Sequence, residues 1–193
     1  ALAPYRPADS RGKDIGMIFQ EPMAALNPSK RVGNLIAGAA MLNLGISKRE
    51  AHRRAIELMT EVGIPAAERR ARAWPHQLSG GLRQRVLIAM ALVGEPRILL
   101  CDEPTTALDV TVQDQILGLL DRLRRERGLA IVFVTHDLAV IRQIAHRIAV
   151  MYAGQIVRQW LDGGVLVEGR RGHRPARRTP PPRVARMGDG WTE

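Results

Sequence analysis

The sequence predicts an α/β fold with a parallel sheet core and an α-helical subdomain. Two short, continuously apolar runs, residues 98–101 and Ala130–Val134, are each followed by a helical pattern. Apolar strands that alternate with helices are typical of parallel sheets covered on both faces. Residues 24–74 are largely helical in pattern, which indicates a helical insert attached to the α/β core.

The remaining elements follow from local signals in chain order. Residues 15–19 are predicted to form a short buried strand. Ser47 and Glu50 form a capping-box pattern, in which Ser47 caps a helix and Glu50 reaches back to the backbone N–H of Ser47. Gly63 and Pro65 end that helix. Further helices are predicted from 80 to 93 and from Asp137 onward. A third has an apolar face formed by Ile116, Leu119, Leu120 and Leu123. Strands are predicted at 147–151 and 155–157, on either side of the turn signal Ala153-Gly154.

Composition limits the class of protein. The chain has 193 residues, which suits one domain with a small subdomain, and its one cysteine excludes an internal disulfide framework. No apolar run approaches the roughly 18–20 residues that cross a bilayer, and no signal peptide is recognisable. The net charge of +10 suggests nucleic acid, but residues 158–193 alone hold eight arginines against four acids. We therefore expect solvated basic surfaces and no nucleic-acid partner.

Polar side chains stand where the predicted strands end. Asp102 and Glu103 follow the first apolar run, His136 follows the second, and Gln20 follows the strand at 15–19. Ligands of α/β sheets bind at the carboxyl ends of the strands, where an acid can hold Mg²⁺ through water and its neighbour can polarise a water molecule. Each residue taken alone has a plain structural explanation, such as a solvated acid pair or a structural histidine.

A glycine-containing turn precedes the helix predicted at 80–93. Residues 78–85 read Leu-Ser-Gly-Gly-Leu-Arg-Gln-Arg, with Ser79 as a good N-cap. Gly80 and Gly81 would let a phosphate approach backbone N–H groups at a helix N-terminus. For Ser-Gly-Gly by itself, an ordinary capped helix is the better explanation.

In this order and spacing, the motifs resemble the ATP-binding-cassette (ABC) family over about residues 14–158. Gln20 is similar to its Q-loop, residues 78–85 to its signature, 99–103 to Walker B, 107–109 to its D-loop and His136 to its switch histidine. The resemblance implies part of a P-loop nucleotidase-like ABC ATPase domain that uses ATP and Mg²⁺. It divides the chain into a remnant before the Q-loop (1–13), the Q-loop strand (14–23), the helical subdomain (24–74), the signature-to-H-loop part of the core (75–157) and a basic tail (158–193).

The resemblance also implies roles for these residues. Glu103 would be the general base, His136 would stabilise the γ-phosphate, and Gln20 would contribute to Mg²⁺ and water. Asp102 would orient Mg²⁺ through water, and Asp109 would couple two sites across a head-to-tail dimer. Nucleotide binding would involve Leu78, Ser79, Gly80, Gly81 and Gln84, acting on the ATP of a partner ATPase subunit.

Finer detail resembles one branch of the family. Residues 20–28, 100–110 and 150–154 are similar to importers of dipeptides, oligopeptides and nickel. The implied protein is peripheral, on the cytoplasmic side of the membrane. Its implied partners are transmembrane permease subunits, docked on residues 24–74, and, indirectly, an extracytoplasmic substrate-binding protein.

Two features depart from the family pattern. The 193 residues contain no G-x-x-x-x-G-K-[ST] phosphate loop, since the one Gly-Lys pair, Gly12-Lys13, lacks the preceding glycine and the following hydroxyl residue. We therefore expect an N-terminally truncated chain, by pseudogene formation, an assembly break or deliberate truncation. The Arg-, Gly- and Pro-rich tail is expected to be disordered from residue 158, either as an out-of-frame extension or as a genuine basic tail.

Two alternatives remain open. ABC-type ATPases of DNA repair share these motifs, but they usually insert long coiled coils or zinc modules, and the 24–74 region has neither heptads nor a cysteine cluster. A truncated, non-catalytic remnant that only binds partners is the second alternative, which the absent phosphate loop favours.

Overall fold

The computed structural model describes residues 12–161 and 164–167. The chain divides into two compact units, with the boundary between Leu138 and Ala139. The first unit contains the sheet β1–β3 with its helices, and the second contains the sheet β4–β6. The helical segment predicted at 24–74 therefore lies in the same unit as the sheet core.

The sheet of the first unit is parallel, as predicted. Its strands are β1 (Ile15–Ile18), β2 (Ile98–Asp102) and β3 (Ala130–Val134), in that spatial order. Ile98 of the central strand lies opposite Ile15 on one side and Ala130 on the other. All three strands end at the same edge of the sheet, so the residues that follow them are brought together although they are far apart in sequence.

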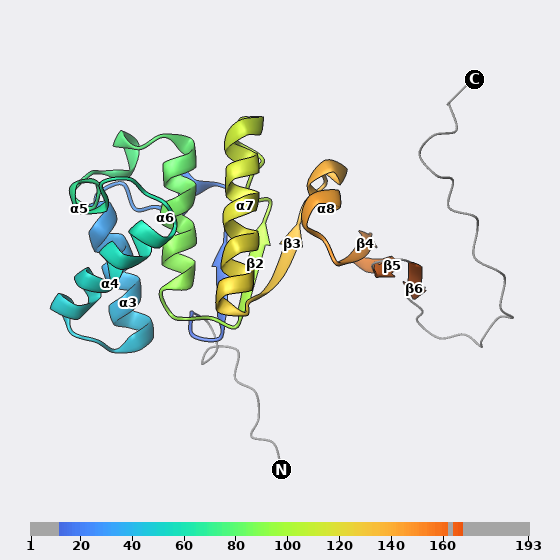
Figure 1. The fold of residues 1–193 in the computed structure, drawn as a ribbon, viewed down its shortest axis with the longest axis horizontal. Helices are drawn as coiled ribbons and strands as arrows, with labels where there is room; N and C mark the ends of the chain where they lie inside the picture. Colours follow the sequence, from blue (N-terminus) through green and yellow to red (C-terminus); the bar gives the residue numbers. More distant parts are fainter. Residues whose placement is uncertain (1–11, 162–163, 168–193) are drawn as a thin grey trace, which may run out of the picture. The chain divides into compact units, whose positions relative to one another are not determined.

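Two long helices cover one face of this sheet. They are α6 (Gly80–Leu92) and α7 (Val110–Arg127), and both begin at the end where the strands finish (Figure 1). Gly16, Leu99 and Cys101 point to this side and are buried. A carbonyl oxygen of α6 lies so close to β1 that a Cβ added at Gly16 would be 2.5 Å from Ala91 O. Helix and strand thus pack directly against each other at this glycine.

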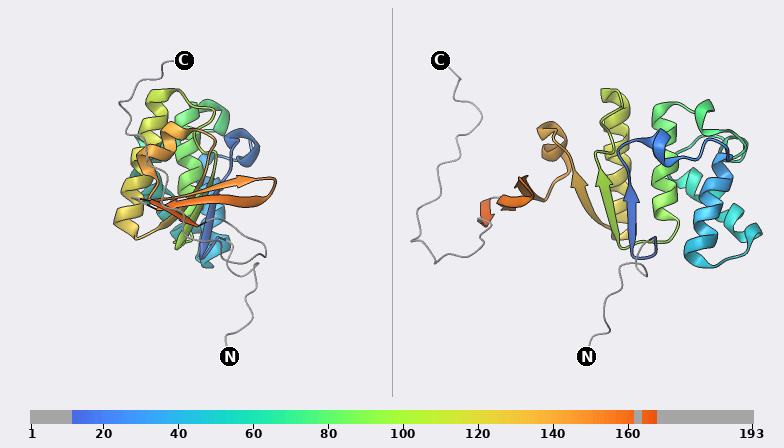
Figure 2. Two further views of the ribbon diagram at one scale, coloured as in Figure 1. Left: turned by 90° about the vertical axis from the view of Figure 1, so that its right-hand side faces the viewer. Right: turned by 180° about the vertical axis from the view of Figure 1, so that it is seen from behind.

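The other face of the sheet carries exposed apolar side chains. Met17 is 42% exposed, Val132 50% and Val134 53%. Seen from behind, the three strands stand in front of α7 (Figure 2, right), and no described helix of residues 12–138 covers them on this side. The sequence predicted a sheet covered on both faces; within the described residues, helices cover one face of it.

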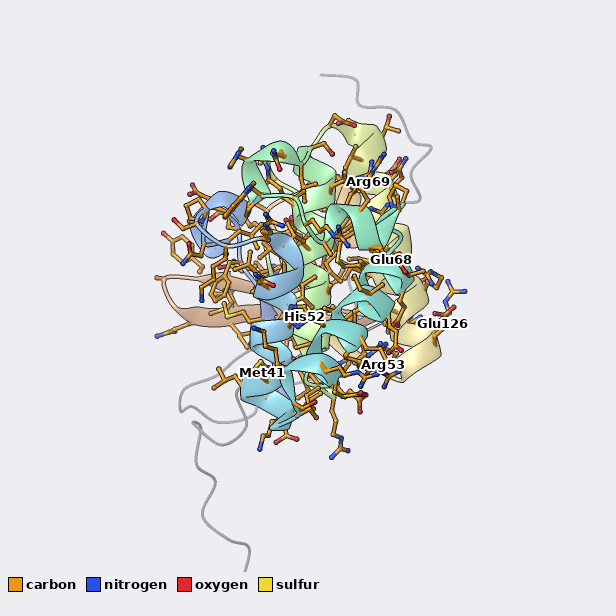
Figure 3. All side chains as sticks on the ribbon, turned by 90° about the vertical axis from the view of Figure 1, so that its left-hand side faces the viewer. Met41, His52, Arg53, Glu68, Arg69 and Glu126 are labelled. Carbon is orange, nitrogen blue, oxygen red and sulfur yellow. The ribbon has the colours of Figure 1, made fainter. Side chains whose placement is uncertain are left out.

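The helical segment 24–74 contains α3 (Val32–Leu44), α4 (Lys48–Glu61) and α5 (Ala67–Arg70); α2 (Pro22–Ala25) overlaps its start, and the 3₁₀ turn η1 (Pro75–Gln77) follows it. Apolar residues of α3, α4 and α6 join those of the sheet in one core cluster. Figure 3 looks onto the outer side of this segment, where His52 of α4 binds Asn34 Oδ1 of α3 at 3.0 Å. The segment is thus packed onto the sheet unit through α6.

Arginines attach the end of α4 to the two long helices. Arg127 of α7 donates to both carboxylate oxygens of Glu61, at 2.6 and 2.5 Å, and Arg122 donates to the Glu61 carbonyl at 2.8 Å. Arg85 of α6 donates to the Val62 carbonyl at 2.5 Å. Cations at the C-terminal end of a helix also complement its dipole. These bonds fix α4 relative to α6 and α7.

The predicted capping box forms in part. Ser47 Oγ accepts the Glu50 backbone N–H at 3.3 Å, so Ser47 is the N-cap of α4. The Glu50 side chain pairs with Arg53 one turn ahead. The expected bond from Glu50 to the backbone of Ser47 was therefore wrong, because an arginine within the same helix competes for the carboxylate.

The boundary falls after the first residue of α8 (Leu138–Ile144), and the second unit continues as an antiparallel sheet of β4 (Arg147–Tyr152), β5 (Gln155–Leu161) and β6 (Gly164–Val167). The expectation of disorder from residue 158 was wrong for the end of β5 and for β6. Val157, Trp160 and Val165 are residue types that favour strands, and the backbone pairing uses them. Residues 162–163 and 168–193, and with them most of the predicted tail, lie outside the described residues, as do residues 1–11. Within the described part, no helix is long and apolar enough to span a membrane.

Two glycines should respond to alanine in opposite ways. Gly16→Ala places a Cβ against the Ala91 carbonyl and should destabilise the protein by about 1–3 kcal/mol. Gly118 is exposed inside α7, and a Cβ added there would have no described atom within 4 Å, so Gly118→Ala should stabilise it by about 0.5–1 kcal/mol. Urea unfolding at one pH measures both. A Gly16→Ala variant as stable as the parent would contradict the packing of α6 on β1.

Candidate functional site

Three side chains, two of them from the ends of neighbouring strands, meet at the carboxylate of Glu103. Gln20, after β1, donates from Nε2 to Glu103 Oε2 at 3.1 Å. His136, after β3, places Nδ1 2.8 Å from Glu103 Oε1. Thr106 donates from Oγ1 to Oε2 at 2.9 Å. The prediction that Glu103 and His136 cluster at one sheet edge is confirmed, with Gln20 in the same network.

The backbone of Glu103 is held in an uncommon conformation. Its φ is +44°, in the left-handed region that residues with a side chain rarely adopt. The Glu103 N–H donates to the Val134 carbonyl at 2.9 Å, and the Thr106 N–H donates back to the Glu103 carbonyl at 3.3 Å. These two bonds fix the chain as it leaves β2 and direct the carboxylate to the ends of the neighbouring strands.

The network sets the electrostatics of its two titratable members. Hydrogen bonds from His136, and then from Thr106, hold the pKa of Glu103 below its ordinary value of 4.5. The bond to Glu103, together with the charges of Glu103 and Asp137, raises the pKa of His136 above 6.5. The Glu103 side chain is 21% exposed and that of His136 is 73% exposed, so water screens their attraction. At neutral pH Glu103 is a carboxylate.

Asp102 and Gln20 offer oxygen atoms that suit Mg²⁺. Asp102 ends β2 half-buried, with no hydrogen bond or ion pair to its carboxylate within the described part of the chain. Gln20 binds Glu103 through nitrogen, which leaves its amide oxygen without a described protein partner. Among the described residues no group of three His, Cys, Asp or Glu could enclose a metal. The two oxygen-bearing side chains, Asp102 and Gln20, would suit a Mg²⁺ that takes its other ligands from phosphate and water, as Mg²⁺ prefers.

The signature residues lie at the N-terminus of α6. Ser79 is the N-cap, its Oγ accepting the Leu82 N–H at 3.4 Å, as predicted. A Cβ on Gly81 would lie 2.6 Å from Val112 Cγ1, and one on Gly80 would lie 3.5 Å from Leu108. Gly81 was predicted to open the backbone to a phosphate, but its nearest neighbour is the first turn of α7. The close approach of two helices therefore already accounts for this glycine.

Two predicted nucleotide-binding side chains lie in the core. Leu78 is 5% exposed and Gln84 is 1% exposed, with Gln84 Nε2 lacking a hydrogen-bond partner within the described structure. Gln84 falls on the same stripe of α6 as Ile88 and Ala91, which faces inward. Both side chains thus face the core of this chain, whereas Ser79 and Gly80 are exposed, and the role of Leu78 and Gln84 in nucleotide binding stays a prediction.

Asp109 and Cys101 have structural environments. Asp109 is the N-cap of α7, its Oδ1 accepting the Val112 N–H at 2.9 Å. Cys101 is 1% exposed, and burial raises the pKa of its thiol to about 12, so it is not a nucleophile at neutral pH. Asp109 therefore orders the start of the helix against which the signature glycines pack.

Sequence reasoning missed Thr106 as a member of the site and Val112 as the neighbour of the signature. Thr106 stands three residues after Glu103 in a turn, a spacing at which side chains meet, so a signal was present. Val112 carries no such signal, because its contact with Gly81 depends on how α6 and α7 cross.

The fold and this edge define a class of protein, the α/β proteins that bind ligands where parallel strands end. Residues 3–106 match the ABC transporter family, which is more than half of the chain. The chain belongs to this family.

Curated relatives and solved structures agree with the assignment. A Brucella melitensis protein named for peptide import is 56% identical over 147 residues, 76% of this chain and 44% of that protein. The oligopeptide transport ATP-binding protein OppD of Bacillus subtilis is 55% identical over 76% of this chain and 41% of its own length. The ATP-binding cassette MJ0796, solved as a dimer in a post-hydrolysis state with ADP and Pi, is 34% identical with a TM-score of 0.70, over 81% of this chain and 66% of its own. The chain thus spans less than half the length of the curated relatives it matches.

Glu103→Gln should return the pKa of His136 toward its ordinary value of 6.5, because the charged partner is lost. The His136 pKa is raised in the folded state, so the pair stabilises the fold below pH 6.5 and loses this effect as pH rises through the folded pKa. The Glu103 pKa is lowered, so the effect also fades as pH falls below 4.5. The difference in melting temperature between parent and variant should therefore be largest between pH 4.5 and 6.5.

Histidine ring signals in NMR spectra report this titration directly. The signals of His52, which binds Lys48 and Asn34 in the helical segment, serve as the internal control and should be the same in parent and variant at each pH. An unchanged His136 titration in Glu103→Gln would mean that the two side chains do not meet in solution.

Proposed function

We propose that these residues are part of the ATP-hydrolysing subunit of an ABC transporter that energises peptide uptake. The observation that carries the proposal is the Glu103 carboxylate, which lies at the carboxyl edge of a parallel sheet within 2.8 Å of His136 and 3.1 Å of Gln20. Membership of the family and the 56% identity to a protein named for peptide import support it.

In the proposed reaction Glu103 is the general base. MgATP supplies the γ-phosphorus, whose bond to the β-phosphate oxygen breaks as the water oxygen bonds to it, so that ADP leaves with the electron pair. Glu103 takes the proton that the water loses. The protein's contribution is positioning and charge stabilisation. Because Glu103 is ionised at neutral pH, it is in the protonation state that a base requires.

His136, Gln20 and Asp102 surround this base. His136 stabilises the γ-phosphate, for which its exposed ring must turn from Glu103 toward the nucleotide. Gln20 contributes its amide oxygen to Mg²⁺ and water, and Asp102 orients Mg²⁺ through water. The carboxylate of Asp102 and the amide oxygen of Gln20 have no partner within the described structure, which supports these assignments.

The signature acts on the nucleotide of a second subunit. Two ATPase subunits associate head to tail, Ser79, Gly80 and Gly81 close over the ATP of the partner, and Asp109 couples the two sites. The similar cassette MJ0796 was solved as a dimer, which supports this arrangement. Gly81 packs against Val112, which lies one helical turn from Asp109, so the signature and the D-loop are in contact through the start of α7.

The transport partners follow from the same family. Permease subunits dock on the helical segment 24–74, which places this protein peripherally on the cytoplasmic side of the membrane, and a substrate-binding protein takes part indirectly. Relatives named for peptide, oligopeptide and dipeptide transport favour peptides over nickel as cargo. Peptide uptake by cells that carry or lack the gene tests the cargo.

The 193 residues alone should not turn over ATP. They contain no phosphate loop and no lysine of such a loop, which in this family supply most of the phosphate contacts. Asp102 and Glu103 would therefore face the triphosphate with too little positive charge nearby. Calorimetry with MgATP and a phosphate-release assay measure binding and turnover. Micromolar binding with steady turnover that disappears in Glu103→Gln would contradict this expectation.

In a version of the protein that carries a phosphate loop before residue 14, Glu103→Gln should bind ATP as the parent does. Its turnover should fall by about 10²–10⁴-fold, the usual cost of losing a general base. Steady-state hydrolysis and equilibrium ATP binding are measured on parent and variant. Arg53→Gln, on the outer side of α4 (Figure 3), is the matched surface control. Near-parental turnover by Glu103→Gln would remove Glu103 from its proposed role.

A further inference from the structure

Thr106 differs from the other two donors to Glu103 in where it comes from. Gln20 and His136 reach Glu103 from the ends of other strands, 83 and 33 residues away. Thr106 is three residues away, in the turn that follows β2. Its contact with Glu103 therefore depends on local backbone geometry and not on the neighbouring strands.

That turn is anchored. Pro104, whose ring restricts φ, is buried, and Thr105 is 5% exposed. The Thr106 N–H bonds to the Glu103 carbonyl at 3.3 Å, and the Leu108 N–H bonds to the Thr105 carbonyl at 3.1 Å. The hydroxyl of Thr106 is thus presented to the carboxylate of Glu103 by a turn whose middle is fixed in the core.

The donors divide the two carboxylate oxygens between them. Oε2 accepts from Thr106 and Gln20, whereas Oε1 contacts His136 alone among the described residues. In the proposed reaction His136 turns to the γ-phosphate, whereas Gln20 offers its amide oxygen to Mg²⁺ and water and can keep its amide nitrogen on Oε2. Thr106 has no second role in that reaction and stays on Oε2, so Oε1 is the oxygen left open.

We propose that Thr106 is a positioning residue that holds Glu103 Oε2, so that Oε1 faces the attacking water. This inference rests on the proposed function, because it concerns the same base. It adds Thr106, which the sequence motifs did not single out, and it assigns separate roles to the two carboxylate oxygens of Glu103. A glutamate side chain has three rotatable bonds, and a fixed donor on one oxygen limits the orientations it samples.

The first test is made on the 193-residue protein and needs no turnover. Thr106→Val keeps the shape of the side chain and removes the donor, Thr106→Ser keeps the hydroxyl, and Thr111→Val makes the same change on an exposed residue of α7 that has no described contact with Glu103. Near the pH where His136 titrates, Glu103 stays ionised and Asp137 is retained, so a change in the His136 titration reports a change in the position of Glu103. NMR should show the raised pKa of His136 moving down toward 6.5 in Thr106→Val but not in the two controls. An unchanged or higher His136 pKa in a folded Thr106→Val overturns the inference.

The second test uses the version with a phosphate loop. Thr106→Val should lower kcat by about 10-fold or more with KM for ATP near the parental value, since a displaced catalytic group costs rate and not binding. Thr106→Ser should restore most of it. If Thr106→Val hydrolyses ATP at the parental rate while Glu103→Gln is inactive, the inference is wrong and the proposed function stands. If Glu103→Gln itself remains active, the proposed function fails.

Discussion

The parallel pairing of β2 with β1 on one side and β3 on the other is the constraint on which the site depends. In a parallel sheet all strands end at the same edge, so Gln20, Glu103 and His136 become neighbours without any contact in sequence. A change in the register of either strand would move Gln20 or His136 away from the carboxylate. The helices α6 and α7 secure this register because they bury Leu99 and Cys101 of the central strand.

The carboxylate of Glu103 is satisfied by three neutral or cationic donors, and this has a consequence for function. A carboxyl group that accepts several hydrogen bonds is stabilised as a carboxylate, and its affinity for a proton is correspondingly lowered. The network therefore keeps Glu103 ionised and oriented while no nucleotide is present. It also occupies His136, which under the proposed function must leave Glu103 before it can stabilise a γ-phosphate. The left-handed backbone of Glu103 is sustained by the bond to Val134.

Packing also links motifs that the sequence treats as separate. The signature glycines lie against the first turn of α7, which Asp109 caps, so a shift of one helix start must move the other. At the far end of the same helices, Arg85, Arg122 and Arg127 hold the end of α4. The helical segment and the sheet edge therefore share α6 and α7 as a common frame.

The sequence by itself determined the parallel sheet, the helical segment, the caps of α4 and α6, and the cluster of Glu103 with His136, because these follow from periodicity, local capping and the common edge of parallel strands. It did not determine what distant neighbours decide. Gln84 and Leu78 are buried through the way α6 packs, and β5 and β6 extend into the region expected to be disordered because strand pairing outweighs nearby Gly and Arg. The contacts of Thr106 with Glu103, of Gly81 with Val112 and of Arg127 with Glu61 were settled only by the tertiary structure. Each of them depends on side chains meeting at distances of a few ångströms, and such distances are set by how whole elements pack, which the pattern of single residues does not encode.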